Sequence, residues 1–127
     1  MYSLPMIAVR NVRASGDWYS RLISCGRDDV AEDFCRLTFE EHVLLLLHGW
    51  EAEEHGAWER TSDARNGNGF LLWFVVEAFD EVYARARALG AQILVEPHEN
   101  AEDGVREFTL RDPDGYAVAI IEETARV

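Results

Sequence analysis

The sequence has few cysteines, few basic residues and no long apolar run. Only two of its 127 residues are cysteines, Cys25 and Cys35, and no Cys-x-x-Cys pair occurs. Two thiols make no disulfide framework, so we expect a reducing, cytoplasmic location. The longest apolar run, residues 43–47, falls far short of the ~20 residues that span a bilayer. The N-terminus also lacks the basic start and apolar core of a secretory signal, and we expect no membrane partner.

The scarcity of basic residues leaves the chain strongly acidic. Lys and Arg number 12 against 24 Asp and Glu, which gives a formal net charge of −12. Such a surface repels phosphate backbones, so nucleic acid is a poor partner, and a cationic or neutral ligand fits better. An acidic surface that serves solubility alone remains the simpler alternative. The length predicts one domain, residues 1–127, that is large enough to bury a core.

Hydrophobic patterning divides the chain into two similar halves. The first half predicts a strand, a helix and further strands, with clear segments at residues 4–9, 15–26, 34–39 and 43–47. The second half predicts the same order, at residues 70–76, 80–90, 93–95, 106–110 and 116–121. Tyr19-x-Arg21 recurs in the second half as Tyr83-x-Arg85. We therefore predict an α+β fold of two βαβββ modules, 1–48 and 70–127.

Two other segments define how the modules are built. Residues 49–69 hold acids, two tryptophans and glycines without a usable period, and we interpret them as a connector that could also act as a lid. Asp112-Pro113-Asp114-Gly115 predicts a tight turn before the last strand, because Pro sets φ and Gly supplies positive φ. A ligand site is then expected in a cleft where the inner faces of the two curved mixed sheets converge.

Three motifs give the chain a family resemblance. These are the stretch 106–115 (REFTLRDPDG), the stretch 79–84 (FDEVYA), and the pattern Val9-x-x-Val12-x-x-Ser15-x-x-Trp18-Tyr19. Together they resemble the vicinal-oxygen-chelate superfamily, which includes glyoxalase I, extradiol dioxygenases, fosfomycin-modifying enzymes and bleomycin-resistance proteins. The resemblance covers most of the chain outside the connector. It implies a fold but no single activity, because one fold hosts many functions.

The resemblance also implies four metal-ligand positions, and here all four are hydrocarbon. They are Leu4, Leu45, Leu71 and Ala119. A divalent cation needs lone pairs on N, O or S, which leucine and alanine lack. If each of these positions is shifted by one residue, the only side chain that offers a ligand atom is Ser3, with its hydroxyl. We therefore expect no metal and no cofactor, and the sequence leans against an enzyme.

The remaining resemblance is to the metal-free bleomycin-resistance branch. It implies an acidic homodimer, with clefts shared between chains, that sequesters a bulky cationic or aromatic compound without chemical change. The alternative is a glyoxalase-like or dioxygenase-like enzyme whose divalent metal is held by relocated ligands. His48, His55 and His98 with nearby glutamates are the only such candidates, and their spacing gives little support. His48 could instead act as a general base in a metal-free reaction.

Strand alternation selects the candidate ligand-binding residues. If Leu71 faces the cleft, Trp73 and Val75 share its face, and Trp73 is the candidate for stacking on a ligand. The same parity adds further positions, and two residues that follow the buried strand complete the set: Leu45, Leu47, Ala117, Ala119, His48 and Trp50. Trp73 could alternatively be a core residue, and Trp50 could pack on a partner chain.

Overall fold

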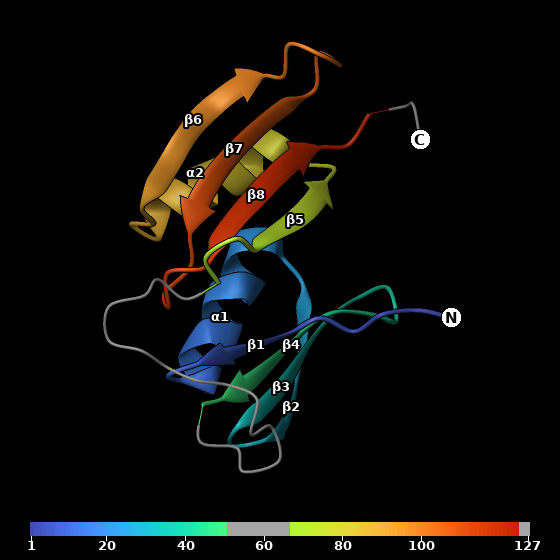
Figure 1. Cartoon of the computed structure of the whole chain (residues 1–127), viewed down its shortest axis with the longest axis vertical. Coiled ribbons are helices and arrows are strands. Elements are labelled where there is room, and N and C mark those ends of the chain that lie inside the picture. Colours follow the sequence, from blue (N-terminus) through green and yellow to red (C-terminus); the bar gives the residue numbers. More distant parts are fainter. Residues whose placement is uncertain (51–66, 125–127) are drawn as a thin grey trace. The chain divides into compact units, whose positions relative to one another are not determined.

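The computed structural model describes residues 1–50 and 67–124, and the chain divides into two compact units, Met1–Ala64 and Arg65–Val127 (Figure 1). Each unit is described by itself. Most of the predicted 49–69 connector, including its possible role as a lid, lies outside the described residues.

The first unit is one helix on a four-stranded sheet. Its elements are, in chain order, β1 (Met6–Val9), α1 (Val12–Ile23), β2 (Gly26–Ala31), β3 (Phe34–Phe39) and β4 (His42–Gly49). The strand order is β1-β4-β3-β2, with β1 parallel to β4 and the other neighbours antiparallel. The predicted apolar run became the central strand β4, whose Leu45, Leu46 and Leu47 are all buried. This burial confirms the prediction of a strand covered on both faces.

The ends of α1 differ from the sequence prediction. The helix begins at Val12 rather than near Ser15, because the Asn11 side chain accepts a hydrogen bond from the Ala14 amide at 3.0 Å and caps the first turn. At the other end Ser24, with φ 55°, takes the left-handed position predicted for Gly26, which instead begins β2. A hydrogen bond from Ser20 Oγ to the Cys25 carbonyl at 2.9 Å supports this exit.

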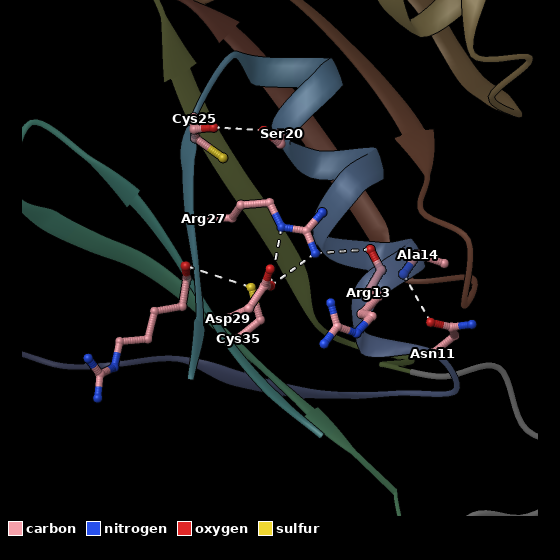
Figure 2. A network of polar contacts seen from close by, with 9 residues as sticks. Asn11, Arg13, Ala14, Ser20, Cys25, Arg27, Asp29 and Cys35 are labelled. Carbon is pink, nitrogen blue, oxygen red and sulfur yellow. Dashed lines mark hydrogen bonds and ion pairs between the residues drawn. The ribbon is translucent and has the colours of Figure 1, made fainter. Parts of the chain in front are cut away.

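Arg27 fastens β2 to the start of α1 (Figure 2). Its guanidinium bonds Asp29 Oδ1 at 3.0 Å and donates to the Arg13 carbonyl at 3.3 Å. Gly16 on α1 allows this approach, since a Cβ there would lie 3.2 Å from the guanidinium carbon and 3.4 Å from Cys35 Sγ. The same contact shows that Cys35 of β3 points toward α1, and this orientation fixes which side chains of the sheet face the helix.

The second unit repeats the architecture of the first. It contains β5 (Leu71–Val76), α2 (Phe79–Ala88), β6 (Ile93–Glu99), β7 (Arg106–Arg111) and β8 (Ala117–Glu122). The strand order is β5-β8-β7-β6, with β5 parallel to β8. Both units thus follow the order βαβββ, and the predicted α+β fold of two such modules is confirmed.

Aromatic rings and one arginine attach α2 to its sheet, and in Figure 1 the helix lies behind the strands. Phe79 and Tyr83 meet Phe108 of β7 edge-on, with ring centroids 5.5 and 5.2 Å apart. The Arg106 guanidinium bridges Asp80 and Glu122. The helix begins one residue before the predicted segment 80–90, after the N-cap Ala78, which makes no side-chain bond, and Asp80 pairs with Arg106.

The predicted turn before β8 is built around a buried carboxylate. Asp112 Oδ1 accepts hydrogen bonds from the amides of Asp114 and Tyr116, both at 2.9 Å, and Gly115 has φ 93°. Asp112 itself is only 4% exposed. The turn therefore sets where β8 begins, and with it the register of the strand that runs beside β5.

Neither helix reaches the length of a membrane span: among the described residues, no helix is long and apolar enough to cross a bilayer.

Candidate functional site

The second sheet has one face covered by α2 and one open face. Phe108 contacts the helix, so its cross-strand partner Ile120, and Phe74 opposite Ile120, point the same way. The alternate positions point away from α2 and form what we call the open face, which runs across β5, β8 and β7. On this face the β5 side chains are exposed, whereas Ala119 and Ile121 of β8 are buried. The face consists of Leu71, Trp73, Val75, Ala117, Ala119, Ile121, Glu107, Thr109 and Arg111. The structure thus brings five predicted site residues, those of β5 and β8, onto one surface.

The β5 side of this open face is an exposed apolar stripe. Leu71, Trp73 and Val75 are 51%, 66% and 61% exposed. Ala119 lies directly beside Trp73 in register, and its small side chain leaves the indole accessible. The alternative that Trp73 is a core residue is therefore wrong. A stripe of three large apolar side chains on an otherwise acidic chain is a feature that usually marks a binding surface.

The first unit contradicts the predicted placement of Leu45 and Leu47. Leu47 is the cross-strand partner of Cys35, which points toward α1, and Leu45 lies two residues away on the same face. Both leucines are fully buried. They are therefore helix-facing core residues and not members of a ligand-binding face.

The face of the first sheet that points away from α1 carries an aromatic pair. His48 of β4 stacks on Phe34 of β3, with ring centroids 5.5 Å apart and planes 30° apart. The Arg36 guanidinium lies 5.8 Å from the Phe34 centroid. His48 is buried, and its Nδ1 lies 3.1 Å from the Gly49 carbonyl. The sequence marked His48 as a site residue but missed Phe34, which only the β3–β4 register reveals.

The two remaining predicted positions lie at strand ends. Leu4 precedes β1 and is exposed, whereas Trp50 follows β4 and is half-buried. Neither placement tests a role in binding.

The positions that the resemblance gives as metal ligands do not fit a metal. Leu4, Leu45, Leu71 and Ala119 are hydrocarbon, and so are Leu44 and Leu46 on either side of Leu45. Within residues 1–50 and 67–124 no group of three or more His, Cys, Asp or Glu could hold an ion. The candidate ligand His55 and the acids beside it lie outside the described residues.

The two cysteines are free thiols in the core of the first unit. Burial raises the pKa of Cys25 to about 11. Burial, and after it the hydrogen bond with Asp29, likewise raises the pKa of Cys35 to about 11. Both side chains are therefore protonated at neutral pH and make poor nucleophiles.

We expect iodoacetamide at pH 8 to alkylate the native protein roughly a hundredfold more slowly than the urea-unfolded chain, because the thiolate population falls tenfold for each pKa unit. Mass spectrometry of timed samples measures both rates. Rapid alkylation of Cys25 or Cys35 in the folded protein would contradict the burial described above.

The two units share the order βαβββ, and in each of them a helix packs against one face of a four-stranded sheet. The sequence pattern of the Glyoxalase/Bleomycin resistance protein/Dioxygenase superfamily matches residues 4–120, and the chain belongs to this superfamily. No curated protein matches its sequence.

Solved structures share the fold at low sequence identity. A protein of unknown function from Agrobacterium tumefaciens is 22% identical, with a TM-score of 0.78, and the match covers 98% of this chain and 94% of that one. A glyoxalase/bleomycin resistance protein/dioxygenase family enzyme from Burkholderia phytofirmans is 23% identical, with a TM-score of 0.77 and coverages of 94% and 96%. A hypothetical protein from S. aureus is 12% identical, with a TM-score of 0.77 and coverages of 97% and 94%.

Proposed function

We propose that this protein binds a bulky aromatic or cationic compound against the open face of its second sheet and leaves it chemically unchanged. In this respect it would resemble the bleomycin-resistance branch of its superfamily. The single observation that carries the proposal is the exposed stripe of Leu71, Trp73 and Val75 on β5. A flat indole flanked by aliphatic side chains suits a planar ring, and an aromatic face attracts a cation.

The absence of reactive groups on this stripe supports binding rather than catalysis. Its β5 and β8 positions are all hydrocarbon apart from the indole nitrogen of Trp73. These β5 and β8 side chains, which would lie beneath the aromatic part of the ligand, offer no nucleophile, no acidic proton and no metal ligand.

Thermal-shift measurements with metal-free bleomycin and other cationic antibiotics, with and without divalent metals, test the proposal. A ligand that binds only the folded form raises the melting temperature by mass action. We expect a shift without metal and recovery of the compound unaltered by mass spectrometry. Stoichiometric Zn, Ni, Mn or Fe in the purified protein, or turnover of the bound compound, would favour the metal-dependent or metal-free enzyme instead.

The net charge of −12 predicts a strong salt dependence of this binding. The acidic field attracts a cation over a distance that salt shortens. We expect the affinity for metal-free bleomycin to fall about tenfold between ~50 and ~500 mM NaCl. Titration calorimetry at several salt concentrations measures this. An unchanged affinity would mean that the acidic surface serves solubility only.

The proposal includes a homodimer with clefts shared between chains, a cytoplasmic location and a role in antibiotic resistance. The two free thiols, Cys25 and Cys35, support a reducing location. Sedimentation velocity tests the dimer. Growth of expressing and non-expressing cells in bleomycin tests the resistance, with Trp73→Ala as the control variant.

A further inference from the structure

A β-bulge in β6 turns His98 onto the open face of the second sheet. Val95 pairs with Thr109 and His98 pairs with Glu107. Between these two pairs the chain advances three residues along β6 but only two along β7. Glu96 points to the helix side, where it accepts a hydrogen bond from Tyr83 Oη at 2.6 Å. Without the extra residue, His98 would follow Glu96 to that side. The bulge, which contains Pro97, reverses this parity.

On the open face His98 meets Glu107. Its Nε2 lies 3.2 Å from Glu107 Oε1, and its Nδ1 lies 3.0 Å from the Glu96 carbonyl. Both side chains remain partly accessible, at 43% and 29% exposure. With an acceptor at each ring nitrogen, the doubly protonated imidazole satisfies both contacts, and it then occupies one oxygen of the carboxylate.

Glu107 belongs to the same surface as the apolar stripe. It pairs with Ile121, and Ile121 pairs with Val75, so one row crosses the sheet from the stripe to the carboxylate. Trp73 lies one row along, at a Cα separation from Glu107 of roughly 12 Å from sheet spacings. A compound with a polycyclic ring and a cationic arm can span this separation.

The charged groups make the two ends of this face electrostatically different. Glu107 and His98 lie at the Val75 end, whereas Arg111 lies at the Leu71 end and donates to the Gly115 carbonyl at 2.8 Å. The facing positions of β8 and β5 carry no charge. A cation bound here is therefore attracted to one end of the face and repelled from the other.

We propose that Glu107 receives the cationic group of a compound whose aromatic part lies on Trp73. The inference rests on the proposed function and deepens it by naming the charge-recognising residue. The Glu107 carboxylate remains partly accessible beside His98, at the end of the face to which a cation is attracted.

The probes are 4-(1-pyrenyl)butylamine, which carries a cationic arm on a polycyclic ring, and 4-(1-pyrenyl)butanol, its neutral counterpart at pH 8. Binding is measured by calorimetry to the full chain. We expect Glu107→Gln to weaken the amine about tenfold and the alcohol less than twofold, because only the ammonium group loses a charged partner. Glu81→Gln is the matched control, since it removes the same charge from α2, on the covered side of the sheet, and is expected to leave both affinities nearly unchanged.

The outcomes separate the two proposals. If the native protein binds neither probe, the proposed function fails and the inference fails with it. If both probes bind and Trp73→Ala weakens both, while Glu107→Gln weakens them equally or not at all, the binding function stands and the role of Glu107 is overturned.

Discussion

Trp73→Ala is expected to weaken binding of metal-free bleomycin, or of 4-(1-pyrenyl)butylamine, at least tenfold. The indole is 66% exposed, so the substitution removes a ligand contact and very little of the protein core. The melting temperature and the circular dichroism spectrum should change little. Calorimetric titration gives the affinity, and the two spectroscopic measurements give the state of the fold.

Two variants make this result specific. Trp73→Phe keeps a flat ring at the same place and should restore most of the affinity. Phe39→Ala removes an exposed aromatic ring from β3 in the first unit and should have no effect. Equal affinities in native protein and Trp73→Ala, with the fold intact, would show that the β5 stripe does not hold the ligand.

Asp112→Ala should destabilise the protein by about 3 kcal/mol, the largest effect on folding that we expect. The carboxylate is buried and accepts hydrogen bonds from two backbone amides. Removing it leaves both donors without this acceptor in a place where water has little access, and such losses cost ~1–3 kcal/mol for each group. Because the turn sets the start of β8, the loss should act on the whole second unit.

Asp103→Ala is the matched control for this prediction. Asp103 also accepts a backbone hydrogen bond, from the Val105 amide at 2.9 Å, but in an exposed loop. Water can replace that bond, so we expect a change below ~0.5 kcal/mol. Urea unfolding followed by circular dichroism measures both variants. Similar small changes in the two would mean that burial of Asp112 contributes little.

The elements with a clear period or a special residue were predicted well from sequence. The repeated module order followed from apolar patterning, and the turn ending in Gly115 followed from its residue types. The exposed position of Trp73 with Leu71 and Val75 followed from simple alternation along β5, because that strand contains no bulge. In these cases local chemistry and the final structure agree.

The assignment of side chains to sheet faces failed where the sequence shows no alternation of apolar and polar residues. Residues 43–47 are all apolar, so nothing in them distinguishes the helix-facing side of β4 from the open side, and Leu45 was assigned to the wrong face. The Phe34–His48 pair was missed for the same reason. His98 was considered only as a metal ligand, since its pairing with Glu107 depends on a bulge that the sequence does not mark.

The irregular path of β6 has a second consequence. This strand forms the outer boundary of the second sheet, where free backbone groups would otherwise invite a strand from another molecule. Pro97 has no amide hydrogen to offer, and the offset beside it interrupts the spacing that an incoming chain would need to match. The bulge that places His98 on the open face thus also protects the protein, at high concentration, against aggregation through the β6 edge.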